Sequence, residues 1–204
     1  MAEISAADVK KLREQTGAGM MDCKKALTDS SGDFDKARVL LRERGVADAA
    51  KRAGKEATEG LIATYLHAPT PGIPAKIGVI LELQTETDFV AKTDATQELA
   101  KNIAMHIAAA KPAYLSIDEI PEDVLATERD LAKKKVEGKP DKVVEQAMEG
   151  AVKKFAKLAC LLEQPWIRDD KTTIGQLVAS HASNTGENSA VRRFVRYEVA
   201  ETLD

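Results

Sequence analysis

The chain has 204 residues, which suffices for one full hydrophobic core and a small accessory module, so one or two domains are expected. Its formal net charge of -3 argues against a protein that is held on nucleic acid by bulk charge. Aromatic residues make up only 4% of the chain, whereas alanine, lysine and glutamate are abundant, so helix should predominate.

The N-terminal segment predicts a module of three short helices. Ser5 followed by Asp8 is a capping-box pattern that starts the first helix. The second helix begins at Met20 and breaks at the polar run "DSSGD". The third follows Asp33 as its N-cap and is expected to end at Gly45, a residue that tolerates left-handed backbone.

Residues 46–60 contain much alanine and charge but almost no large apolar side chain. This composition favours a helix that buries little, so it predicts an exposed helical linker ending at Gly60. We therefore expect a three-helix module over residues 1–45, this linker, and a larger core over 61–204.

Beyond the linker the pattern becomes that of strands. "LIATYLHA" and "KIGVILELQTE" flank the turn "PTPGIP" and predict an antiparallel hairpin. Helical spacing follows over residues 96–110, 125–138 and 140–162, and a loop then leads to a short helix that includes His181. A closing strand has these residues on its apolar side: Val191, Phe194 or Val195, Tyr197 and Val199. The fold class is α+β, with an antiparallel or mixed sheet packed with helices.

Residues suited to catalysis or metal binding are few. The three histidines, His67, His106 and His181, lack ligand partners at metal spacing, and we interpret them as structural or solvent-facing. Cys23 and Cys160 lie far apart in helical segments, which favours reduced, core or half-buried thiols. Phosphate-loop and nucleophile-elbow motifs are missing from the sequence. We expect a binding protein, not an enzyme, with no cofactor and no metal.

Targeting signals are also missing. No basic segment followed by an apolar run opens the chain, and no apolar run reaches the roughly eighteen residues of a membrane span. A cytoplasmic protein without membrane association is expected.

Two stretches are candidate binding surfaces. In "GAGMM", two adjacent methionines lie about 100° apart on a helix, so they either both enter a small core or leave a contact patch for a partner. In "TDFV", Thr87 or Asp88 caps a helix and Phe89 packs inward, or Phe89 stays exposed; periodicity alone favours the inward arrangement.

Longer stretches carry a family resemblance. "LREQTGAGMMDCKKAL" (12–27) and "ELQTETDFVAK" (82–92) resemble the two signature stretches of bacterial elongation factor Ts, the guanine-nucleotide exchange factor for elongation factor Tu. Further similar segments occur in the family's order, among them "IAMHIAAAKPAYL" and "GENSAVRRFVRYEV", so the likeness covers nearly the whole chain.

The resemblance implies a ubiquitin-associated-like module that binds a helix of the partner's G domain, and an α+β core whose Asp-Phe tip reaches the partner near its magnesium and phosphate site. The implied contacts with elongation factor Tu are Arg13, Met20 and Met21 in the module and Thr87, Asp88, Phe89 and Val90 at the tip. The short length resembles family members in which a homodimer supplies a second half, so residues 61–204 are also the expected dimerisation domain.

Three positions at two places depart from the family pattern. Gln84 and Thr85 stand where the family usually has Asn-Cys, and Thr96 stands where a Phe commonly begins the next helix. In this chain, other residues must therefore provide the support that such a ring would give to the tip. The alternative function is a ubiquitin-associated-like adaptor or a ribosome- or RNA-associated protein, motivated by the basic stretch "VRRFVR" and disfavoured by the acidic total.

Overall fold

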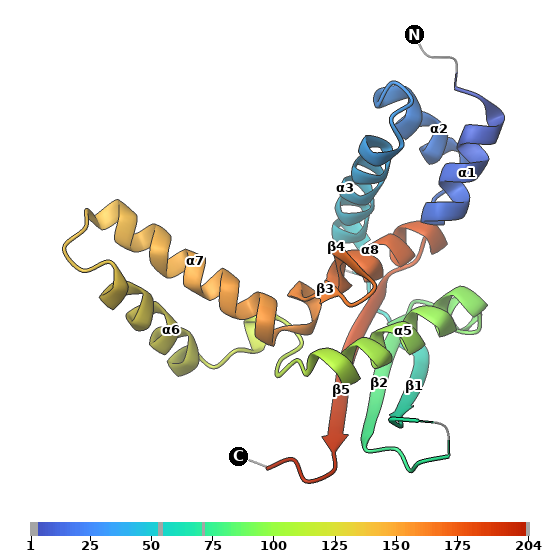
Figure 1. Cartoon of the computed structure of the whole chain (residues 1–204). Coiled ribbons are helices and arrows are strands. Elements are labelled where there is room, and N and C mark those ends of the chain that lie inside the picture. Colours follow the sequence, from blue (N-terminus) through green and yellow to red (C-terminus); the bar gives the residue numbers. More distant parts are fainter. Residues whose placement is uncertain (1–3, 53–54, 71, 203–204) are drawn as a thin grey trace. The chain divides into compact units, whose positions relative to one another are not determined.

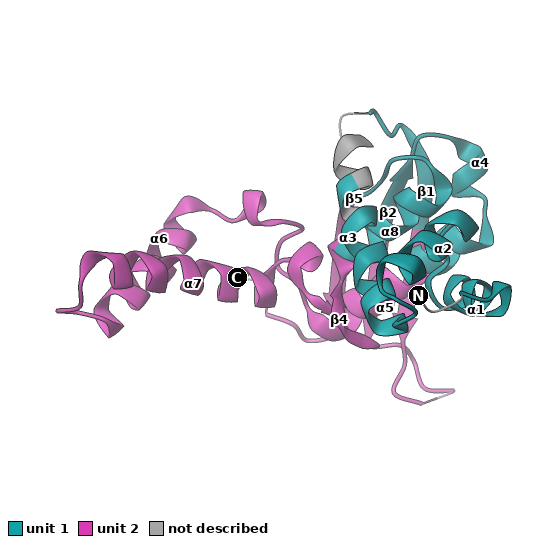
Figure 2. Ribbon diagram, turned by 90° about the horizontal axis from the view of Figure 1, so that it is seen from above, with its two compact units in different colours: residues 1–62, 82–100, 176–192 teal, residues 63–81, 101–175, 193–204 magenta. Residues whose placement is uncertain are grey.

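The structure is a computed structural model that describes residues 4–52, 55–70 and 72–202, and it confirms the α+β fold (Figure 1). Parts of the predicted module, linker, turn and core therefore lie outside the described residues: 1–3, 53–54, 71 and 203–204. The chain forms two compact units (Figure 2), here unit 1 (residues 1–62, 82–100 and 176–192) and unit 2 (residues 63–81, 101–175 and 193–204).

Groups of helices are separated by single strands or strand pairs along the chain. In order they are α1 (Ala6–Thr16), α2 (Met20–Asp29), α3 (Phe34–Arg52), β1 (Glu59–His67), β2 (Ile77–Thr85), α4 (Asp88–Ala91), α5 (Asp94–Ala110), η1 (Ile117–Glu119), α6 (Glu122–Lys135), α7 (Asp141–Ala159), η2 (Leu161–Glu163), β3 (Pro165–Trp166), β4 (Asp169–Thr173), α8 (Ile174–Thr185) and β5 (Ser189–Glu198).

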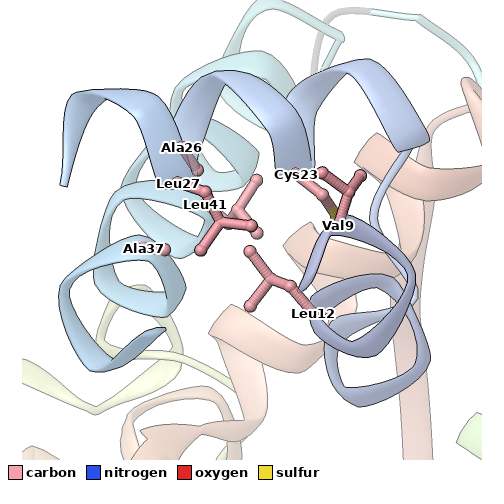
Figure 3. Close-up of a cluster of buried hydrophobic side chains, with 7 residues drawn as sticks. All are labelled: Val9, Leu12, Cys23, Ala26, Leu27, Ala37 and Leu41. Atoms are coloured by element: carbon pink, nitrogen blue, oxygen red, sulfur yellow. The ribbon is translucent and has the colours of Figure 1, made fainter. Parts of the chain in front are cut away.

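The three N-terminal helices form as the local sequence predicts. Ser5 and Asp8 make a complete capping box at the start of α1, and Gly17 ends that helix with a φ of 70°. Asp33 Oδ1 accepts hydrogen bonds from the N–H groups of Asp35 and Lys36, which caps α3. Figure 3 shows the core between the three helices, made by Val9, Leu12, Cys23, Ala26, Leu27, Ala37 and Leu41.

The predicted end of the third helix at Gly45 is wrong, because α3 continues without a break to Arg52. Gly45 is buried, and a Cβ added to it would lie 3.7 Å from Ser180 Cα and 3.8 Å from Ser183 Cβ. The residue therefore lets α3 and α8 approach closely instead of ending a helix. Residues 55–58 are not helical, so the helical linker predicted over 46–60 is helical only in its first part among the described residues.

The predicted hairpin is confirmed as β1 and β2, and the sheet has the order β1-β2-β5. Neighbouring strands run antiparallel: Lys76 N–H donates to His67 O over 3.0 Å, and Val199 N–H donates to Lys76 O over 2.9 Å. Gly60 belongs to β1 and does not end a helix, which corrects the prediction. Its φ is 151°, and a Cβ there would lie 2.3 Å from Leu83 O, so only glycine fits.

Unit 2 contains the helical hairpin of α6 and α7, which lie side by side (Figure 1). Its base is a small core of Ile120, Leu125, Ala156 and Cys160. The chain segment before η1 is tied to this base, since Leu161 N–H donates to Tyr114 O over 2.9 Å. Sequence patterns predicted these helices but not the short β3–β4 hairpin, which falls in the segment interpreted as a loop.

The closing strand is present as β5, with Val191 buried and Phe194 half-buried, but the predicted apolar side is wrong at Tyr197 and Val199. Tyr197 and Val199 are exposed, whereas Arg196 turns inward: its Nε donates to Ala108 O over 3.3 Å, and its Nη1 donates to Glu201 over 3.0 Å. Arg196 can be buried there because carboxylates and a carbonyl satisfy its guanidinium. On β5, therefore, a basic residue, Arg196, faces the interior, where an apolar side chain was expected.

Among the described residues, no helix combines the length and the apolar character that a membrane crossing requires.

Candidate functional site

A four-residue helix, α4, carries the tip of unit 1. β2 ends at Thr85, a fully buried residue whose Oγ1 donates to Thr87 O over 2.8 Å and so bends the chain out of the strand. Thr87 then has extended backbone, and its Oγ1 accepts a hydrogen bond from Val90 N–H, which makes it the N-cap of α4. Of the two predicted caps, Thr87 is therefore the one used.

Phe89 is 80% exposed, so the inward packing that periodicity favours is wrong. The inward position of the short helix is taken by Ala91, which is buried. An exposed phenylalanine gains little stability for the folded chain. The tip thus presents a large aromatic ring to solvent just beyond the end of β2.

Asp88 is paired within its own helix. Lys92 Nζ donates to Asp88 Oδ2 over 2.5 Å, at the i, i+4 spacing that brings side chains together on a helix. This hydrogen bond lowers the pKa of Asp88 and raises the pKa of Lys92, and the opposite charges act in the same direction. The carboxylate is therefore ionised at neutral pH and stands beside the exposed ring.

The N-terminal end of α4 is held by a residue one hundred positions away in the sequence. One carboxylate, that of Glu187, accepts from Thr87 N–H over 3.0 Å and from Thr87 Oγ1 over 2.8 Å. A second bond joins the same two segments with the roles reversed: Glu86 Oε1, next to Thr87, accepts from Asn188 N–H over 2.6 Å. Each segment therefore provides one carboxylate and one backbone N–H group to the other.

The other end of α4 is held by Thr96 of α5, which is itself bonded to His181 of α8. Thr96 Oγ1 donates to Val90 O over 2.6 Å and lies 2.9 Å from Nε2 of His181, whose Nδ1 lies 3.0 Å from Ser189 Oγ. Thr96, His181 and Ser189 are all buried. Thr96 thus connects the tip through its hydroxyl to a buried polar chain.

The second predicted contact region is the turn between α1 and α2. Met20 is 47% exposed and Met21 is 73% exposed, so the alternative in which both fill the module core is wrong. The buried side of α2 is formed by Cys23, Ala26 and Leu27. The two methionines are the first residues of this helix and lie outside that buried side. Arg13, in the last turn of α1, is also exposed.

The described residues offer no grouping for metal chemistry, since nowhere among them do three His, Cys, Asp or Glu side chains gather as a metal site. His106 is buried with its Nε2 2.9 Å from Gln164 Oε1, and burial lowers the pKa of His106 and of His181. Burial also raises the pKa of the Cys160 thiol to about 11 and raises that of Cys23. These groups are poor nucleophiles and bases at neutral pH.

Unit 2 has an apolar surface on its part of the sheet, formed by Leu66, Ile80, Val195 and Tyr197, all exposed. The opposite face carries the buried Val79 and Leu81 of β2 and the inward-turned Arg196 of β5. Leu66 and Ile80 share a side, because a Cβ on Gly78 would lie 3.4 Å from Leu66 Cδ2 and alternate residues of a strand face the same way. Exposed patches of this kind mark protein interaction sites.

Comparison with known proteins gives one consistent result. A family model described as Elongation factor TS matches residues 33–201. A protein named Elongation factor Ts from Moorella thermoacetica is 51% identical over 202 residues, covering 98% of this chain and 97% of that protein. Proteins of the same name from Desulforamulus reducens and Frankia casuarinae are 50% and 48% identical, covering 100% and 98% of this chain and 93% and 100% of their own lengths.

Proposed function

The chain belongs to the elongation factor Ts family, and from that premise we propose that it is the guanine-nucleotide exchange factor for elongation factor Tu in translation elongation. The observation that supports this most strongly is Phe89, which is 80% exposed on a short helix held in place by hydrogen bonds at both ends. A protein with no binding role for the ring has little reason to fix it in solvent.

The exchange acts through linkage. Bound guanine diphosphate is held largely by its phosphates, by magnesium and by backbone N–H groups of the partner's phosphate loop. The factor binds a conformation in which this site is incomplete, so factor and nucleotide weaken each other's binding equally. Coupling energies of about 1–3 kcal/mol give only about 5–150-fold effects, so efficient exchange requires several contacts acting together.

The two exposed regions of unit 1, the turn between α1 and α2 and the tip at α4, have different roles in exchange. Arg13, Met20 and Met21 bind a helix of the partner's G domain, and the flexible thioether side chains adapt to that surface. Phe89 then wedges between partner helices and shifts the elements that position magnesium.

The remaining tip residues act beside the ring. Asp88 competes for the polar partners of the elements that Phe89 shifts. Its ion pair with Lys92 opens at small cost, because exposed pairs of this kind contribute little. Thr87 and Val90 line the contact on either side of these two residues.

A homodimer completes the functional molecule. The exposed apolar face of unit 2 on β1, β2 and β5 is the surface at which two copies meet, burying side chains such as Tyr197 that a monomer leaves in water. The partner-binding module predicted over residues 1–45 then extends along α3, the linker predicted over 46–60 is reduced to the segment between α3 and β1, and the dimerising core predicted over 61–204 begins with β1. The setting is the cytoplasm, with no direct nucleic-acid contact.

The test is release of a fluorescent guanine diphosphate from elongation factor Tu, followed by stopped flow with and without this chain. The proposal predicts a release rate that rises with the concentration of the chain to a plateau. A pull-down with elongation factor Tu separates the adaptor alternative: excess guanine diphosphate dissociates the complex of an exchange factor, whereas it leaves an adaptor's complex intact.

A further inference from the structure

Both ends of the tip helix α4 are fixed by residues outside it. At its start, the Glu187 carboxylate takes the only two donors of Thr87, its N–H and its hydroxyl. Because the hydroxyl proton points to Glu187, the oxygen lone pairs are free to accept from Val90 N–H. The cap that begins α4 is thus oriented by Glu187.

At the end of α4, a buried polar chain lies behind Val90. The hydroxyls of Thr93 and Thr96 lie 2.9 and 2.6 Å from Val90 O, and Thr96 Oγ1 also lies 2.9 Å from His181 Nε2. A neutral imidazole joins Thr96 to Ser189 in either tautomer, because one ring nitrogen donates and the other accepts. The imidazole is neutral in this arrangement, in line with the lowered pKa that its burial causes.

Thr96 itself lies on α5, whereas Glu187 and the two residues behind Thr96 come from one short stretch of sequence. His181 lies on α8, and Glu187 and Ser189 follow within the turn and first strand residue after it. The same helix meets the N-terminal module: a Cβ on Gly17 would lie 3.1 Å from Asn184 Nδ2, and one on Gly45 would lie 3.7 Å from Ser180 Cα. Ser180 and Asn184 are one helical turn apart, so they face the same way.

We propose that α8 and the turn after it form a brace that holds the Met20–Met21 surface and the Phe89 tip at a fixed separation, with Glu187 and Thr96 as positioning residues for Phe89. This inference rests on the proposed exchange function. The brace holds α4 in one conformation before the partner binds. Binding therefore does not lose the conformational entropy of ordering α4, and more of the binding free energy of Phe89 is available. Phe89 supplies the wedge, and the brace determines where the wedge stands relative to the module.

The decisive experiment measures partner-stimulated guanine diphosphate release as a function of factor concentration for wild type, Glu187→Ala, Phe89→Ala and the double variant. Loss of preorganisation is expected to lower the maximal rate about tenfold in Glu187→Ala. The half-saturating concentration should stay within about twofold, because the module contact is unchanged. In the Phe89→Ala background, Glu187→Ala should have no further effect, since residues that act as a unit are not additive.

Glu119→Ala is the matched control. Its carboxylate also accepts from a loop N–H, that of Leu115 over 3.0 Å, but it lies in unit 2. Its release curve should match wild type. Should Glu187→Ala fail to fold by circular dichroism, Thr96→Val tests the other support: it is expected to lower the maximal rate, whereas Thr96→Ser, which keeps the hydroxyl, restores it.

The outcomes separate the two proposals. If wild type does not accelerate release, the exchange function itself is wrong. If wild type accelerates release and Phe89→Ala slows it, but Glu187→Ala or Thr96→Val leaves the maximal rate unchanged, the brace is wrong. Multiplicative effects of Glu187→Ala and Phe89→Ala would also overturn it, because they would show that Glu187 acts without Phe89.

Discussion

Phe89→Ala should separate stability from function. Phe89 is 80% exposed, and full burial of a phenylalanine is worth about 1.5–3 kcal/mol, so the buried fifth contributes only about 0.3–0.6 kcal/mol. The free energy of unfolding should therefore change by less than about 0.6 kcal/mol, against about 3–5 kcal/mol for a phenylalanine in a core. Urea denaturation measures this difference directly.

In the proposed complex with elongation factor Tu, the same truncation removes the aromatic wedge. Loss of a binding hot spot costs at least about 2 kcal/mol, which corresponds to about a thirtyfold slower stimulated release of guanine diphosphate. Leu158→Ala is the matched control, because Leu158 is 67% exposed on α7 and lies outside the proposed contact residues. A release rate for Phe89→Ala equal to that of Leu158→Ala, in a folded protein, would refute the wedge.

Four further changes test other parts of the account. Replacing both Met20 and Met21 by alanine should weaken the complex with elongation factor Tu at least about tenfold by calorimetry, while unchanged affinity would mean that the exposed methionines bind nothing. Tyr197→Asp should convert a dimer to a monomer by light scattering, because it places a charge in the apolar face of unit 2; a wild-type monomer would contradict the dimer. Gly60→Ala should lower the free energy of unfolding by more than about 2 kcal/mol, since its Cβ would lie 2.3 Å from Leu83 O, and an unchanged urea midpoint would show that β1 adapts. Burial lowers the pKa of His106 and His181 below the ordinary value of 6.5, so the unfolded chain gains protons first as pH falls. The free energy of unfolding should therefore be unaffected by these histidines above about pH 6.5 and should decrease below it. The decrease is up to about 1.4 kcal/mol per pH unit for each histidine, until the pKa of the folded state is reached. Equal urea midpoints at pH 7.5 and 5.5 would contradict this expectation.

The elements of this fold were largely predictable because their signals are local. Capping at Ser5 and Asp33, the hairpin around the Pro-Gly turn and the helical spacing of α5 to α7 depend on residues a few positions apart. The errors arose where distant segments meet. Gly45 is read locally as a helix end, but its role is the close approach to Ser180, and Gly60 is likewise explained by Leu83.

The candidate site shows the same division. The sequence pointed to Phe89 and the methionine pair, although periodicity alone placed Phe89 inside. The supports of the tip carried no local signal, because Glu187 meets Thr87 across one hundred residues and His181 meets Thr96 across 85. The departures from the family pattern at Thr85 and Thr96 indicated only that support for the tip had to come from other residues; both hydroxyls bond the tip's backbone.

Whether this chain opens the nucleotide site of elongation factor Tu is decided by the rate at which guanine diphosphate leaves that partner. Wild-type chain should raise the release rate to a concentration-dependent plateau, and Phe89→Ala should lower the plateau about thirtyfold. A release rate that is the same with and without the wild-type chain would show that the proposed exchange function is wrong.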